Sequence, residues 1–255
     1  MKKTLKIAVL LCLATVMICL ASCNKQPTQP QETTPTATTP AETTPEVTTP
    51  EPTTPSEPVL VDSINGKTVL EIMEEFAAAE SFDYSLFIIG TEIETGVEVV
   101  NTQTIRFNND EFTMCLQADE AVIYIAYVDG ICYQSHGDGA KTKFSADSIE
   151  AVFEQVFSGI DIRKNAGNNI PQEGLDMLSK ADIYFYEDVY TITLEIEREG
   201  EIHSTTLSFN AAGKVIKTES YANQILISEF TYHSYGEPIE ILPPEDADEY
   251  VLEEW

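Results

Sequence analysis

Apolar and polar side chains alternate along much of this chain, and few folds accommodate that pattern. Residues 190–197 read YTITLEIE, with an apolar side chain at every second position. Because successive side chains of a strand point to opposite faces, this segment predicts a strand with one apolar face. Similar segments follow one another through residues 84–135 and 183–234, with short turns between them. The series predicts an antiparallel meander in which one face of the sheet is apolar.

The turns also predict which residues pair. If Asn109-Asp110 is a two-residue turn, Phe107 lies opposite Phe112 and Ile105 lies opposite Met114. The turns at residues 118–120 and 129–130 extend this register to the pairs Met114 with Ile125, Leu116 with Ile123, Cys115 with Tyr124, and Cys132 with Tyr127. The two cysteines are then ~10 Å apart and on different faces, beyond the Cα separation of about 7 Å that a disulfide tolerates. We therefore predict two free thiols.

Three segments have helical rather than strand spacing. The first begins near Asn65, a residue able to cap a helix, and its apolar face is predicted to contain Val69, Leu70, Met73, Phe76 and Ala77. The other two are Ala146–Phe157 and Gln172–Lys180. Long sheets curl, so the fold class predicted is α+β: a curled antiparallel sheet of about eleven strands, or half-barrel, with helices over its concave face.

The apolar face of this sheet carries the candidate ligand-binding residues. Such a sheet either packs solid against its helices or encloses a cavity that holds an apolar ligand. Helices ~10 Å wide are few beside a sheet roughly 50 Å across at ~4.8 Å per strand, so we expect a ligand to cover part of the face. The candidates are Ile105, Phe107, Phe112, Met114, Leu116, Ile123, Ile125, Ile192, Leu194 and Leu207.

The first 22 residues are predicted to be a lipoprotein signal peptide. Lys2, Lys3 and Lys6 precede an apolar run of 14 residues, Ile7–Leu20, which is short for a bilayer span of ~20 residues. The following Leu-Ala-Ser-Cys, residues 20–23, resembles the bacterial lipobox. That resemblance implies that Cys23 receives a diacylglyceryl group and becomes the first residue of the mature chain, which the lipid attaches to a membrane.

Residues 23–58 are predicted to be the lipidated cysteine followed by a disordered spacer. Nine of the 13 prolines lie in residues 24–58, and Thr-Thr-Pro-x-x repeats five times from Thr33 to Glu57. Such a sequence buries too little apolar area to form a core, and its prolines favour extended conformations with a reach of order 100 Å at ~3.1 Å per residue. Residues 59–255 then form the folded domain.

Charge and motifs exclude several classes of function. Removal of residues 1–22 takes away three lysines and no acidic residue, leaving 11 basic against 43 acidic residues and a net charge of −32. A chain this acidic is not expected to bind nucleic acid. The three histidines lack metal-ligand spacing and no catalytic motif is present. We therefore expect no enzyme activity, no metal site, no catalytic residue and no cofactor.

Three stretches of the domain resemble one family. They are NGKTVLEIMEEFAAAESFDYSLF, LSFNAAGKVIKTES and the ending FTYHSYGEPIEILPPEDADEY. They look like the LolA/LolB and LppX/LprG-like lipoprotein-carrier fold, a half-barrel closed by helices that carries lipid groups or lipidated proteins. In the ending, the matching residues are Tyr235, Gly236, Pro238, Ile239, Ile241 and Pro243.

Two functions stay open at this point. One is an extracytoplasmic carrier or sensor that binds a lipid or lipid-like ligand between sheet and helices. The other is a non-catalytic tethered module that binds a protein or wall polymer at the cell surface. In both, lipid on Cys23 would hold the chain to a membrane, and the long spacer favours the outer face of the cytoplasmic membrane of a single-membrane bacterium. The sequence predicts no particular protein partner.

Overall fold

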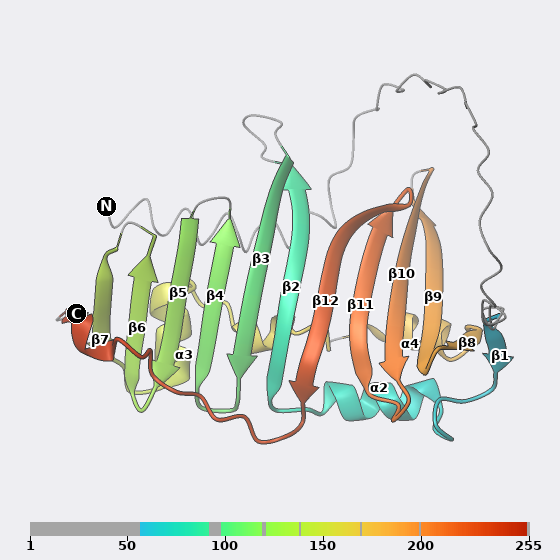
Figure 1. The fold of residues 1–255 in the computed structure, drawn as a ribbon, viewed down its shortest axis with the longest axis horizontal. Helices are drawn as coiled ribbons and strands as arrows, with labels where there is room; N and C mark the ends of the chain where they lie inside the picture. The colour runs from blue at the N-terminus through green and yellow to red at the C-terminus, as the bar shows by residue number, and fades with distance from the viewer. Residues whose placement is uncertain are drawn as a thin grey trace, which may run out of the picture.

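In the described part of the chain, the fold is an open sheet with three short helices against one face (Figure 1). The computed structural model describes residues 57–91, 98–118, 121–137, 139–168, 170–198 and 200–253. The predicted signal peptide, Cys23 and most of the spacer therefore lie outside the described residues. Within the described part, the predicted α+β class with a curled sheet is confirmed.

Thirteen strands form one sheet in the order β1-β8-β9-β10-β11-β12-β2-β3-β4-β5-β6-β7-β13. Two meanders, β2–β7 and β8–β12, meet where β12 pairs with β2. The strands are β1 (Val59–Val61), β2 (Phe82–Thr91), β3 (Glu98–Phe107), β4 (Phe112–Ala118), β5 (Ala121–Val128), β6 (Ile131–His136), β7 (Lys141–Ser145), β8 (Ile183–Tyr186), β9 (Val189–Arg198), β10 (Glu201–Asn210), β11 (Val215–Ala222), β12 (Ile225–Tyr235) and β13 (Val251–Leu252).

The predicted strand count and the purely antiparallel character were wrong. The two additional strands are the edge strands β1 and β13, which have three and two residues. Such short segments show no periodicity, and each pairs with a strand far away in the sequence. β13 is also parallel to its neighbour β7, with Val251 opposite Thr142, so the sheet is mixed.

The predicted register is confirmed in both directions from β4. Phe107 pairs with Phe112 and Ile105 with Met114, and the next strand continues the row, with Ile125 opposite Met114. Cys115 lies opposite Tyr124 and Cys132 lies opposite Tyr127, and both thiols are free. Burial raises the pKa of the Cys132 thiol to about 12, which makes it a poor nucleophile at neutral pH.

The helices are α2 (Val69–Ala77), α3 (Ile149–Val156) and α4 (Gln172–Leu178), with short 3-10 turns at Ile162–Asn165 and Ala247–Glu249. The predicted cap of α2 was wrong. Thr68 caps this helix: its hydroxyl accepts from the Glu71 backbone at 3.3 Å, and the Glu71 carboxylate accepts from the Thr68 backbone at 2.8 Å. Asn65-Gly66 forms a tight turn with positive φ at both residues, the conformation that Asn-Gly favours.

The residues predicted for the buried face of α2 were also partly wrong. The buried positions are Val69, Ile72, Met73 and Phe76, whereas Ala77 is exposed and Leu70 is 36% exposed. With the helix beginning at residue 69, the buried side chains follow the spacing i, i+3, i+4, i+7. Leu70 lies one helical step away from that row and faces solvent.

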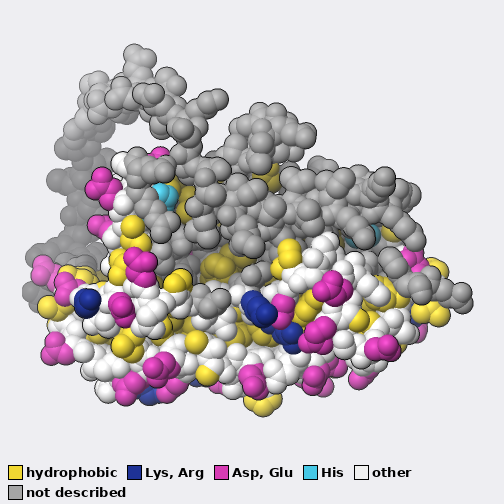
Figure 2. Space-filling view, turned by 180° about the vertical axis from the view of Figure 1, so that it is seen from behind, with side chains coloured by type: hydrophobic (Ala, Val, Ile, Leu, Met, Phe, Trp, Pro, Cys, Tyr) yellow, Lys and Arg dark blue, Asp and Glu magenta, His cyan; other side chains and the backbone are white. Residues whose placement is uncertain are grey.

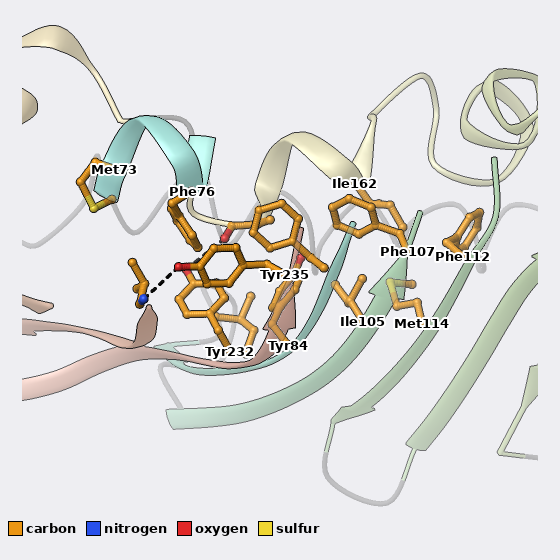
Figure 3. Close-up of a cluster of buried hydrophobic side chains, with 14 of the residues drawn as sticks. Met73, Phe76, Tyr84, Ile105, Phe107, Phe112, Met114, Ile162, Tyr232 and Tyr235 are labelled. Carbon is orange, nitrogen blue, oxygen red and sulfur yellow. Dashed lines mark hydrogen bonds between the residues drawn. The ribbon is translucent and has the colours of Figure 1, made fainter. Parts of the chain in front are cut away.

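The main core lies between the helices and the sheet (Figure 3). We call this face of the sheet the helix-side face; it carries Tyr84, Ile105, Met114 and Ile192. Phe76 of α2 contacts the rings of Phe82, Tyr232 and Tyr235, with centroids 5.5, 5.0 and 4.9 Å away. Phe112 contacts Phe153 and Phe157 at the end of α3, at 5.6 and 5.9 Å.

A second, smaller core lies on the opposite face, under the C-terminal segment. Residues 236–253 run across the ends of β2–β7 in front of the sheet in Figure 1, and they cover Ala126, Val128 and Tyr133 with Ile241 and Tyr250. The rings of Tyr133 and Tyr250 meet edge to face at 5.3 Å. Lys141 forms ion pairs with Asp246, at 2.5 Å, and with Glu249. Residues 236–250 of the ending quoted above are therefore a strap that covers this part of the sheet.

Candidate functional site

All ten candidate ligand-binding residues lie on the helix-side face, but in two separate groups. One group lies on β3, β4 and β5, and the other comprises Ile192, Leu194 and Leu207 on β9 and β10. Strands β11, β12 and β2 lie between the groups. Tyr84, Phe230 and Tyr232 fill this gap with aromatic rings and belong to the same packed region. The candidates therefore do not form one continuous patch by themselves.

Seven of the ten candidates are packed in the main core together with helix side chains, and their exposed fractions do not exceed 7%. At these positions, protein side chains already fill the face that was predicted to bind a ligand. The seven are Ile105, Phe107, Phe112, Met114, Ile125, Ile192 and Leu207.

Leu116, Ile123 and Leu194 lie further along their strands, away from the helices. Figure 1 shows α2, α3 and α4 behind one end of the sheet, and the strands extend beyond them towards the ends of β2, β4 and β9. Ile123 and Leu194 are half-buried and pack at the border of the main core. Leu116 pairs with Ile123 across β4 and β5 and is 5% exposed. None of the three belongs to the buried main core: Leu116 lies outside it, and Ile123 and Leu194 only border it.

Two buried amides accompany these residues. Asn101 on β3 is 8% exposed and Gln134 on β6 is 6% exposed, and the strand register places both on the helix-side face. Gln134 pairs with Ile125, and its side-chain nitrogen donates a long contact of 3.9 Å to the Cys132 sulfur. Sequence reasoning missed both amides because it counted apolar positions only. The sequence pattern that could have revealed them is a polar residue at a strand position whose side chain points to the helix-side face.

One buried hydroxyl lies in the centre of the helix-side face. Tyr84 is fully buried, and its Oη has no hydrogen-bond partner among the residues that the structure describes. Burial raises the pKa of Tyr84, with a smaller contribution from Tyr232. Tyr232 differs, because its Oη donates to the Ala166 carbonyl at 3.0 Å. Gly167 permits this close approach: a Cβ there would lie 2.5 Å from the Tyr232 oxygen, and the φ of Gly167 is +75°.

This pair of tyrosines gives a prediction about stability. Tyr84→Phe removes a buried hydroxyl without a partner and is expected to raise the free energy of unfolding by about 1 kcal/mol, whereas Tyr232→Phe is expected to lower it by about 1 kcal/mol. Urea unfolding followed by circular dichroism measures both. A loss of stability in Tyr84→Phe as large as that in Tyr232→Phe would mean that the Tyr84 hydroxyl has a polar partner.

The ionisable groups do not assemble into a reaction centre in the described part of the chain. There, no three His, Cys, Asp or Glu side chains are grouped to hold a metal ion. His203 on β10 lies 3.8 Å from Glu201 of the same strand. His233 on β12 lies 2.9 Å from the Ser85 hydroxyl on β2. Figure 2 shows acidic side chains scattered over the visible helix side, with few Lys or Arg among them. The absence of enzyme activity stays a prediction.

Membrane attachment and family membership also stay predictions. No helix among the described residues is long and apolar enough to cross a bilayer. No family model matches the chain, and no curated protein matches it.

Proposed function

We propose that this protein is a lipid-anchored extracytoplasmic lipoprotein whose domain binds an apolar, lipid-like ligand as a carrier or sensor. The observation that carries the proposal is the uneven cover of the helix-side face. Figure 1 shows the helices behind one end of the sheet. Leu116, Ile123 and Leu194 lie outside the buried main core, with Ile123 and Leu194 half-buried at its border. In a half-barrel of the lipoprotein-carrier type, which the sequence resembles, this is the region where an acyl chain would lie.

The ligand we propose is amphipathic rather than purely apolar. An acyl chain would lie against Ile123, which is half-buried and pairs with Leu116, and would remove its remaining apolar surface from water. Asn101 and Gln134 are buried amides beside this pair, and amides both donate and accept hydrogen bonds. They would bind ester carbonyls or hydroxyls of a lipid next to its chains. In most ligand sites, a few polar groups orient the ligand within a largely apolar pocket.

The anchor would be a diacylglyceryl group on Cys23, and the spacer would hold the domain away from the membrane. The spacer joins the domain at the edge strand β1. A carrier held in this way would collect or deliver a lipid within reach of its own membrane, on the outer face of the cytoplasmic membrane of a single-membrane bacterium.

A tethered interaction module is the second candidate, and the opposite face of the sheet favours it. On β9–β12 this face carries hydroxyls and charged groups in place of apolar side chains. Thr193 and Thr206 share a hydrogen bond of 3.0 Å, and Lys217 lies 3.1 Å from Glu229. A broad polar sheet face of this kind would suit a protein or a wall polymer better than a lipid.

A matched pair of variants tests the lipid proposal. Ile123 faces the helix side, and Val122, the preceding residue, faces the opposite side with 41% of its surface exposed. We expect Ile123→Trp to weaken the binding of a fluorescent fatty acid by about tenfold, equivalent to 1.4 kcal/mol, because the larger ring occupies the path of the chain. Val122→Trp should leave binding unchanged. Fluorescence titration measures both affinities.

The parent protein supplies the other control. Native mass spectrometry of the purified protein should detect a co-purified lipid. If the folded parent binds no probe and carries no lipid, the lipid proposal fails and the interaction module takes its place. Equal weakening by both tryptophan variants would place the probe somewhere other than the helix-side face.

A further inference from the structure

A hollow of about 490 Å³ lies at the β1 edge of the sheet, on the face away from the proposed lipid site. It is lined by Pro58, Tyr184, Tyr186, Glu187, Val189 and Thr191. Tyr184 pairs with Thr191 and Tyr186 pairs with Val189, so the lining forms two neighbouring rows across β8 and β9. Leu60 of β1 pairs with Tyr184, and the two side chains are 58% and 44% exposed. An apolar strip therefore leads out of the hollow along the sheet edge.

The chemistry of this lining selects one class of ligand. Two tyrosines, a valine and a proline supply apolar and aromatic surface, and polar groups are few. The Tyr186 hydroxyl donates a hydrogen bond to the Glu187 carboxylate, and this hydrogen bond raises the pKa of Tyr186. Shallow grooves lined by aromatic rings bind proline-rich segments in the polyproline II conformation, because that helix is already extended and loses little entropy on docking.

The chain carries such a segment immediately before the hollow. Residues 52–58 read PTTPSEP, with prolines at 52, 55 and 58. A polyproline II helix has three residues per turn, so these prolines share one edge of the helix. The earlier prolines at 35, 40, 45 and 50 are five residues apart and do not share an edge. Pro27 and Pro30 are three residues apart but number only two, so the row of three prolines lies at the end of the spacer. Pro58 of that row already lines the hollow.

We propose that residues 52–57 dock as a polyproline II helix on the opposite face of β8 and β9, with Pro55 in the hollow. The dimensions agree with this placement. Val59 pairs with Phe185, so Pro58 begins beside Tyr186 at the sheet edge. Pro55 is three residues away, a reach of ~9 Å in polyproline II, and two strand spacings from β1 to β9 are ~10 Å. The docked segment would fix the direction in which the domain extends from its spacer.

Distances between two spin labels in the mature chain, residues 23–255, test this proposal. The labels are placed on Glu51→Cys, just before the docked segment, and on Glu74→Cys, an exposed position of α2. Cys23→Ala and Cys115→Ala remove the other accessible thiols, while Cys132 is fully buried. Pulsed electron paramagnetic resonance should show a narrow distance component. The pairs Pro52→Ser with Pro55→Ser, and Tyr184→Ser with Tyr186→Ser, should each abolish it.

The matched control is the pair Pro45→Ser with Pro50→Ser, which removes two prolines of the five-residue period and should keep the narrow component. A broad distribution in the parent, or a narrow component that survives loss of Pro52 and Pro55, would overturn the proposal. A narrow component that disappears on dilution with unlabelled protein would also overturn it, since the segment would then dock on a second copy. The proline variants lie outside the sheet, so they test docking even if the tyrosine variants fail to fold.

Discussion

Phe76→Ala is expected to lower the free energy of unfolding by about 3–5 kcal/mol, the range measured for large aromatic truncations in protein cores. Phe76 is 1% exposed, and its ring is surrounded edge to face by Phe82, Tyr232 and Tyr235. These three rings come from β2 and β12, the two strands that join the meanders. The cavity left by alanine would therefore open at the centre of the sheet, where rigid neighbours from both meanders limit its collapse.

Denaturant unfolding of the parent and the variant measures this loss. Leu70→Ala is the matched control, because Leu70 belongs to the same helix but is 36% exposed, and it should cost less than about 1 kcal/mol. If Phe76→Ala costs no more than Leu70→Ala, α2 does not pack on the sheet as described. A large loss with a changed denaturant slope would instead indicate that the two meanders unfold separately.

Cys23→Ser is expected to remove nearly all of the processed protein from the membrane. Each buried CH₂ of an attached acyl chain contributes about 0.8 kcal/mol to membrane binding, and stable anchoring needs two chains or a second signal. The spacer cannot replace them, because it is polar and carries acidic residues. Partitioning into Triton X-114 measures the effect: the mature parent should enter the detergent phase, and the variant should appear as an unprocessed precursor or as a shed aqueous form.

A second cysteine variant makes this test specific. Cys115→Ser alters a half-buried thiol within the sheet and should leave partitioning unchanged. Equal partitioning of the Cys23 variant and the parent would disprove the anchor. The domain would then need another means of reaching a membrane lipid.

The sequence predicts local pairing in this fold far better than distant pairing. The rows Phe107 with Phe112 and Met114 with Ile125 follow from turn length alone, because a hairpin of known turn has only one register. The β1 and β13 pairings could not be found in this way. Val59 pairs with Phe185 and Val251 with Thr142, and no turn connects either pair, so only the assembled sheet determines their positions.

The same limit applies to the candidate site. Alternation places Ile105, Ile123 and Ile192 on one face, and the structure agrees. Alternation does not show how far each helix extends over that face, since this depends on the packing of side chains such as Phe153 against Phe112. Ile192 is therefore core, whereas Ile123 lies at the border of the core.

The short strand β1 also has a mechanical consequence. It is the strand that follows the spacer, and only Val59, Leu60 and Val61 pair with β8. Tension between an anchored N-terminus and a domain held by a bound partner would act first on these few backbone hydrogen bonds. We expect β1 to detach at a lower force than the long central strands and to lengthen the connection by ~10 Å, at ~3.4 Å per residue. Detachment would leave the edge of β8 unpaired, a surface on which another strand can add, so stretching would change what this end of the sheet can bind.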